Sequence, residues 1–237
     1  CEYLGGKYIS YTEEKPITMN PFNITQAELN IEKIDFLKNL ILLIWKGSDA
    51  QVSELEFRIV EQMVTDYYDA YFHGFEGYDP VQRETLRKTL TAYEKRRNSG
   101  NTEDQSLLEK KVEERISLLE KRRKALKVTS LSFNTFYEYS CERLELICLE
   151  NNISGIDYDR YIYMIQPFYK GGTYDKILNE NVDTTLFSET FIVFEVDAIK
   201  ENKKLFPIVT LIIMDVFLQK MRIKKNRKVL IIEEAWL

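Results

Sequence analysis

The feature that most constrains the fold is a strand–helix–strand pattern near the end of the chain. Residues 191–196 form a continuous apolar run with a single acid, and residues 229–232 form a second run. Between them, residues 205–222 have the composition of an apolar helix, with Pro207 in its first turn, where proline is tolerated. Two such runs joined through a helix are typical of a βαβ unit with parallel strands covered on both faces.

Two adjacent acids, Glu233 and Glu234, directly follow the second apolar run. In open parallel α/β sheets, ligands bind at the carboxyl end of the strands. An acid at this position of a P-loop ATPase holds Mg²⁺, usually through water, and the next acid can orient or deprotonate the attacking water. A divalent cation would also relieve the repulsion between neighbouring carboxylates. A strand that simply ends in solvent-exposed acids is the alternative that these residues leave open.

Helical patterns dominate the middle of the chain. Ser132 can cap a helix that extends to about Asn151, and Ser48 with Gln51 fits a capping box for an earlier helix. Apolar residues recur at three- and four-residue spacing in the stretches 31–45, 52–67, 86–93 and 108–119. The last two of these stretches predict a charged helical hairpin at about residues 80–127.

Charge is distributed unevenly along the sequence. Residues 82–127 contain 14 Lys and Arg against 8 Asp and Glu, whereas the whole chain has a net charge of −5. The weakly acidic total gives no support to a general nucleic-acid coat. The basic clusters 95–97 and 121–124 could contact phosphates or acidic partners. Because they lie among glutamates on predicted helices, we expect them to form a solvated helix face instead.

The sequence carries no sign of secretion or of a membrane span. The cysteines Cys1, Cys141 and Cys148 fit no zinc or redox spacing and are interpreted as reduced thiols. The longest apolar stretch, 206–218, is interrupted by Asp215 and is shorter than the roughly 20 residues that a span needs. Because the chain starts with Cys and stops just after a strand-like run, we expect it to be an excerpt of a longer protein.

The ending Glu-Glu-Ala-Trp after an apolar strand resembles the TraG-type conjugation ATPases of type IV secretion systems. The resemblance extends to Tyr-Leu-Gly-Gly-Lys-Tyr-Ile at 3–9, Met-Asn-Pro-Phe at 19–22, Phe-Tyr-Lys-Gly-Gly-Thr-Tyr at 168–174 and the strand at 191–197. We expect the match to be weakest in the charged hairpin.

The resemblance implies an α/β fold, namely a RecA-like P-loop NTPase core fragment with a large all-helical insertion. The core would comprise residues 1–24 and 188–237, and the insertion residues 25–187. The first strand should meet the last two across the insertion. In the resembling family, Glu233 takes the Mg²⁺-associated, cofactor-binding position and Glu234 the position of the catalytic carboxylate, with ATP and Mg²⁺ as cofactors.

The phosphate-binding motif Gly-x-x-x-x-Gly-Lys-Ser/Thr does not occur in this sequence. We therefore expect the chain alone to bind ATP poorly and not to hydrolyse it. By resemblance, the parent protein would be a hexamer at the cytoplasmic side of the bacterial inner membrane. It would work with other type IV secretion components and couple ATP hydrolysis to channel assembly or DNA transfer.

Two other hypotheses for function stay open. One is a DNA-pumping motor of the coupling-protein or FtsK-like kind, which shares the strand and its acids. The other is a non-enzymatic docking module for secretion partners, formed by the helical segment 25–187.

Several single residues have both a functional and a structural interpretation. Glu195 and Asp197 could flank a nucleotide site from the neighbouring strand, or could serve as loop and capping residues. The Gly171-Gly172 pair could approach a nucleotide or a neighbouring subunit, or could form a turn. His73, the only histidine, has no neighbours that suggest catalysis, and we predict a structural or surface role.

Overall fold

The computed structural model describes residues 5–12, 16–97, 105–181, 184–223 and 227–233, and most of these are helical. The strands are β1 (Lys7–Ser10) and β2 (Ile192–Glu195). The α-helices are α1 (Ile31–Lys46), α2 (Glu54–Phe72), α3 (Pro80–Arg97), α4 (Gln105–Ala125), α5 (Phe133–Asn151), α6 (Tyr158–Ile165), α7 (Asp175–Asn179) and α8 (Leu205–Ile223). Short 3-10 turns lie at Gln26–Glu28, Gln166–Phe168, Thr184–Phe187 and Asp197–Ile199.

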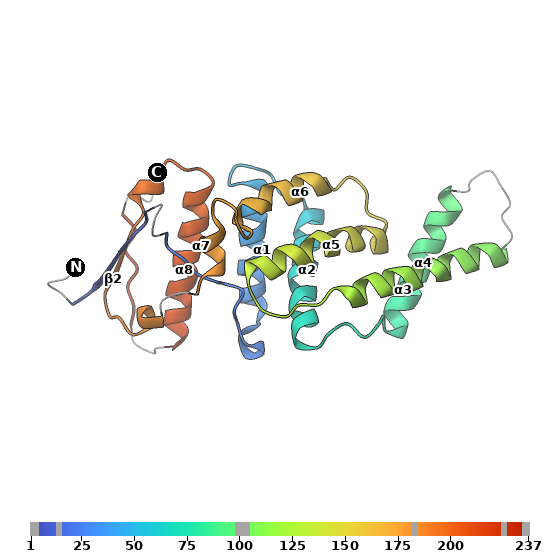
Figure 1. The fold of residues 1–237 in the computed structure, drawn as a ribbon, viewed down its shortest axis with the longest axis horizontal. Helices are drawn as coiled ribbons and strands as arrows, with labels where there is room; N and C mark the ends of the chain where they lie inside the picture. Colours follow the sequence, from blue (N-terminus) through green and yellow to red (C-terminus); the bar gives the residue numbers. More distant parts are fainter. Residues whose placement is uncertain (1–4, 13–15, 98–104, 182–183, 224–226, 234–237) are drawn as a thin grey trace.

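The molecule is elongated, with the strands at one end and α3 and α4 projecting at the other (Figure 1). Between them lies a helical body in which α1 packs against α2, α6 and α8, and α2 packs against α5. The α3–α4 pair occupies the stretch in which the sequence predicts a charged hairpin, and the two helices pack against each other.

Local sequence explains where the body helices begin and end. Gly47, at φ 85°, follows the last residue of α1 in a conformation that favours glycine. The α2 helix starts at Ser53, whose hydroxyl accepts a hydrogen bond from the Glu56 amide while the Glu56 carboxylate accepts the Ser53 N–H at 2.8 Å. The capping box therefore uses Ser53, not the predicted Ser48. Ser132 caps α5 as predicted.

The two strands pair in parallel, with Lys7 opposite Ile192 and Ser10 opposite Glu195. The N–H of Lys7 donates to the carbonyl of Phe191, and that of Tyr11 donates to the carbonyl of Glu195, both at 2.9 Å. The first strand therefore meets the strand that precedes α8, although most of the chain lies between them.

The prediction of a third strand at residues 229–232 is wrong. Residues 229–232 form no strand, and their side chains are between 39% and 78% exposed. An apolar run becomes a strand only if it has a partner for its backbone groups, and in the described part of the chain this run pairs with neither β1 nor β2.

The predicted fold class is also wrong. In place of an α/β RecA-like core, the described residues form a mostly helical structure with two short parallel strands. The physical reason lies in α8, which was expected to cover a sheet. Its apolar residues Ile208, Val209 and Ile212 belong to the same core as the residues of α1, against which α8 packs, and from the strands only partly buried residues such as Ile9 and Phe194 pack against that core.

One apolar core extends across the predicted boundaries between core fragment and insertion. It contains Met19 and Phe22 from before α1, Leu40 from α1, Tyr67 from α2 and Ile212 from α8, all nearly or fully buried. Residues 19–22, before α1, and α8 are thus folded onto the helical body.

A second apolar cluster holds the hairpin. It is formed by Leu86 and Leu90 of α3, by Val112, Ile116 and Leu119 of α4, and by Leu146 of α5. Leu144 and Ile147, neighbours of Leu146 on α5, belong to the main core. The α5 helix therefore carries side chains of both clusters.

Candidate functional site

The carboxyl ends of β1 and β2 lie side by side, as parallel pairing requires. The acids there, Glu195 at the end of β2 and Asp197 just after it, have local partners. The Glu195 carboxylate accepts the N–H of Asp197 at 2.9 Å, and Asp197 pairs with Lys200 at 2.7 Å. These contacts favour the structural alternative, in which Glu195 and Asp197 are loop and capping residues and do not flank a nucleotide site.

Glu233 lies at the end of the exposed segment 229–232 and is itself exposed. Glu234, the predicted catalytic residue, and Trp236 lie outside the described residues. Among the residues that the structure describes, no three His, Cys, Asp or Glu side chains are grouped so that they could hold a metal ion.

The segments that carry the family resemblance converge in the structure. Segment 3–9 contains β1 and segment 191–197 contains β2, and these pair. Phe22 of segment 19–22 contacts Phe133 edge-on at a centroid distance of 6.0 Å, and Phe133 contacts Phe168 of segment 168–174 at 6.1 Å. The N–H of Met19 donates to the carbonyl of Ile177 at 2.9 Å, just after that last segment.

The Gly171-Gly172 pair forms a tight turn between the Gln166–Phe168 turn and α7. Gly171 has φ 78°, in the left-handed region. A Cβ at Gly172 would lie 2.4 Å from the carbonyl oxygen of Pro167, so the backbones approach too closely for any other residue. The turn is closed by the N–H of Tyr174, which donates to that same carbonyl at 2.8 Å.

We predict that Gly172→Ala lowers the free energy of unfolding by about 1–3 kcal/mol, the typical cost of forcing atoms into occupied space. The added Cβ would meet backbone atoms of Pro167 and Gln166, and backbone cannot move aside as a flexible side chain can. Urea unfolding followed by circular dichroism measures the loss. Gly155→Ala gives for comparison the cost of a positive φ without a clash, because nothing lies within 4 Å of its Cβ position and φ is 87°. Gly172 is not among the positive-φ glycines, so its loss reflects the clash alone, and a loss below about 1 kcal/mol would contradict the prediction.

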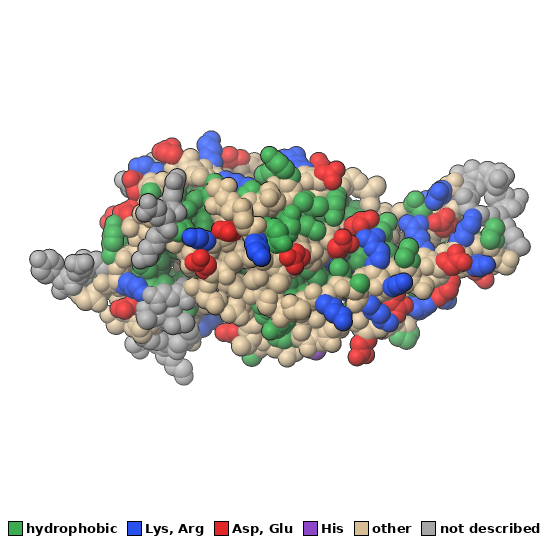
Figure 2. Space-filling model, in the orientation of Figure 1, with side chains coloured by type: hydrophobic (Ala, Val, Ile, Leu, Met, Phe, Trp, Pro, Cys, Tyr) green, Lys and Arg blue, Asp and Glu red, His purple; other side chains and the backbone are tan. Residues whose placement is uncertain are grey.

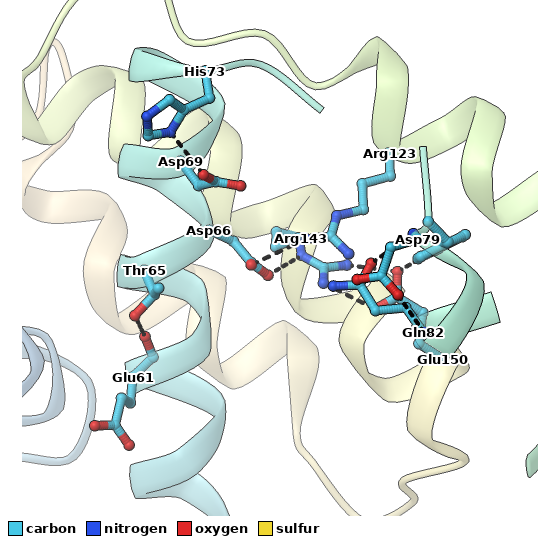
Figure 3. A network of polar contacts seen from close by, with 11 residues as sticks. Glu61, Thr65, Asp66, Asp69, His73, Asp79, Gln82, Arg123, Arg143 and Glu150 are labelled. Atoms are coloured by element: carbon cyan, nitrogen blue, oxygen red, sulfur yellow. Dashed lines mark hydrogen bonds and ion pairs between the residues drawn. The ribbon is translucent and has the colours of Figure 1, made fainter. Parts of the chain in front are cut away.

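A buried polar network fastens the hairpin to the body (Figure 3). At its centre, the fully buried guanidinium of Arg143 donates to Glu150 through both terminal nitrogens, at 2.9 and 2.8 Å, and to Asp66 of α2 at 2.8 Å. Asp66 also pairs with Arg123 of α4 at 3.0 Å, and Glu150 accepts the Tyr78 hydroxyl at 2.6 Å. The network thus joins α2, α4, α5 and the segment before α3.

Some of the hairpin's positive charge is matched by acids of the body. Arg122 pairs with Glu145 at 2.6 Å and with Glu142 at 3.2 Å, both on α5, and Arg123 pairs with Asp66. Of the two basic clusters, 121–124 therefore has an acidic partner within the same chain. The cluster 95–97, at the far end of α3, is exposed, and both signs of charge are interspersed over the hairpin surface in view (Figure 2).

The remaining candidates have structural roles or local partners. His73 follows α2 as its C-cap, and its exposed ring contacts Asp69 at 2.9 Å and Gln26 at 3.0 Å. Cys141 and Cys148 are free thiols on α5, and burial raises the pKa of Cys141 to about 11. A thiol with a raised pKa is a poor nucleophile at neutral pH.

Comparison with known families places the chain in a class. The family model described as "TraG P-loop domain" matches residues 1–76 and 70–237, and these two segments together cover the chain. That description belongs to conjugation-related P-loop NTPases, a class that uses nucleotide and usually Mg²⁺. The chain belongs to the TraG P-loop domain family.

The second matched segment includes the charged hairpin. No curated protein and no solved structure matches the chain. None of the helices within the described residues is long and apolar enough to cross a membrane.

Proposed function

We propose that the chain is part of an ATPase that couples ATP hydrolysis to conjugative DNA transfer or to assembly of a type IV secretion channel. The observation that carries this proposal is the family match along the whole chain, together with Glu233 and Glu234 directly after an apolar run. Glu233 is proposed as the Mg²⁺-associated acid and Glu234 as the catalytic carboxylate.

The chain contributes only one part of such a nucleotide site. The phosphate-binding Gly-x-x-x-x-Gly-Lys-Ser/Thr loop does not occur in its sequence. We therefore propose that the isolated chain does not hydrolyse ATP, and that the intact ATPase supplies the remaining groups. The intact protein is proposed to work as a hexamer at the cytoplasmic face of the inner membrane, together with other secretion components.

A second function is favoured by the hairpin. Two helices project from the body and are fixed at their base by the buried network around Arg143 (Figures 1 and 3). A rigid projection of this kind suits a docking module for secretion partners, and this role is compatible with ATPase activity in the intact protein.

The test is ATP hydrolysis by the intact ATPase and by its Glu234→Gln variant, because glutamine keeps the size of the side chain and loses the base. We expect the variant to bind nucleotide and to lose turnover. Glu195→Gln is the matched control, since this exposed acid caps its own loop, and it should keep full turnover. If Glu234→Gln is as active as the unaltered protein, Glu234 is a loop acid and the docking function takes first place.

A further inference from the structure

Asp215 is the only acidic residue of α8, a helix otherwise rich in Leu, Ile, Val and Phe, and its side chain is 5% exposed. A buried carboxylate is costly unless it is paired and hydrogen-bonded. Asp215 has two partners, because its Oδ2 accepts hydrogen bonds from Lys33 Nζ of α1 and from Gln219 Nε2, both at 2.7 Å. The ion pair joins residues 182 positions apart in the sequence.

Lys33 is as well buried as its partner. Its side chain is 4% exposed, and its Nζ lies 4.6 Å from the centre of the Phe36 ring. Burial lowers the pKa of Lys33, and the Asp215 carboxylate opposes that shift. Each charge is thus held in a site that would be costly without the other.

Stability alone does not account for such a pair, because apolar residues of similar volume in its place are often equally or more stabilising. An ion pair can in addition favour one relative orientation of the two helices over others. The apolar stripe of α8 could pack on α1 with more than one rotation or register, but only one arrangement brings Asp215 to Lys33.

Neighbouring contacts fix the same half of α8. Arg222 pairs with Glu32, the residue before Lys33. Lys220 Nζ donates to the carbonyls of Leu186 and Glu189, in the segment that leads into β2. The end of α8 therefore contacts both the helical body and the approach to the sheet, and in the sequence α8 precedes the segment 227–233.

We propose that Lys33 and Asp215 are a positioning pair, which sets the rotation and register of α8 on the helical body and thereby places the segment 227–233 for nucleotide hydrolysis. This inference rests on the proposed function. It assigns to α1 and α8 a role that is separate from the carboxylates themselves.

The decisive variant is Lys33→Met with Asp215→Leu in the intact ATPase, which removes both charges and keeps the volume. We expect a Tm equal to or above that of the unaltered protein, a kcat lower by about tenfold or more, and a KM for ATP within about twofold, since a misplacement of roughly 1 Å can cost about 10²-fold in rate. The charge-swapped variant, Lys33→Asp with Asp215→Lys, should recover part of the lost kcat. Lys88→Met with Glu84→Leu, an exposed pair on α3, is the matched control and should leave Tm, kcat and KM unchanged.

If the apolar double variant keeps kcat within twofold, the pair serves the fold alone and the proposal is overturned. If the unaltered ATPase hydrolyses no ATP, the proposed function fails, and the distance between spin labels introduced at Ile231 and at Tyr163 of α6, both exposed, then decides the positioning proposal. A changed distance in the double variant at unchanged Tm supports it, and an unchanged distance overturns it.

Discussion

Replacing Arg143 with methionine is expected to lower the free energy of unfolding by about 3–5 kcal/mol, the range found when one partner of a buried ion pair is removed. The guanidinium is fully buried and is the shared partner of Glu150 and Asp66. Without it, Glu150, which is 8% exposed, keeps only the Tyr78 hydroxyl among the contacts described above. Equilibrium unfolding in urea, followed by circular dichroism, measures the change.

Two further variants separate charge from geometry at this site. Arg143→Lys keeps the charge but cannot form the bidentate contact with Glu150, so we expect an intermediate loss of stability. Arg143→Met combined with Glu150→Leu should recover most of the stability, because no unpaired charge is left at Glu150, and Asp66 retains Arg123. The exposed Arg58, changed to methionine, is the control. A loss below about 1 kcal/mol for Arg143→Met would contradict this account of the network.

The Phe22→Ala variant is expected to lose about 3–5 kcal/mol of stability, as is usual when a buried phenylalanine is truncated and leaves a cavity. Phe22 is 0% exposed and lies against Phe136 at a centroid distance of 5.1 Å and against Tyr67 at 6.1 Å. Its carbonyl accepts the hydroxyl of the buried Tyr68 at 2.9 Å. The ring therefore joins the start of the chain to α2 and α5.

The same urea titration, with near-ultraviolet circular dichroism as a second probe of aromatic packing, tests this expectation. Phe22→Leu should cost less than Phe22→Ala because more of the buried volume is kept. Tyr163→Ala, at an aromatic side chain that is 76% exposed, should change the free energy of unfolding by no more than about 0.5 kcal/mol. A loss for Phe22→Ala as small as that of Tyr163→Ala would show that segment 19–22 does not anchor the core.

The helices were predictable because their signals are local. The apolar spacing at 31–45 and 52–67 lies within α1 and within or just before α2, and the Ser132 hydroxyl caps α5 by accepting the N–H of Thr135, three residues later. The cap of α2 was predicted at Ser48, but it lies at Ser53, which is likewise followed by a suitable residue three positions later. In the structure Glu56 also contacts Lys46 at 2.6 Å, and this contact favours the Ser53 box.

The strands were less predictable because strand formation depends on partners. Segments 7–12 and 191–196 contain β1 and β2, which supply each other's hydrogen bonds, whereas the equally apolar run 229–232 has no such partner among the described residues. The prediction of the fold class was wrong for the same reason. An apolar helix signals burial, but its sequence does not reveal whether a sheet or another helix covers it.

The candidate site was predictable only in part. The acids Glu233 and Glu234 and the family segments are visible in the sequence, and the family match supports the interpretation of the chain as a whole. The Arg143 network and the Lys33–Asp215 pair were missed because their partners lie far apart in the sequence. One signal was available, namely a single acid within the apolar stretch 206–218, because an acid in such a helix requires a partner.

The position of α5 has a mechanical consequence. Its side chain Leu146 belongs to the apolar cluster of the hairpin, and its neighbours Leu144 and Ile147 belong to the main core. The hairpin is therefore held to the body through α5, and Arg143 on the same helix joins α5 to α2. An unbroken series of packed helices, from α5 to α2, from α2 to α1 and from α1 to α8, thus connects the base of the hairpin to the helix that precedes Glu233.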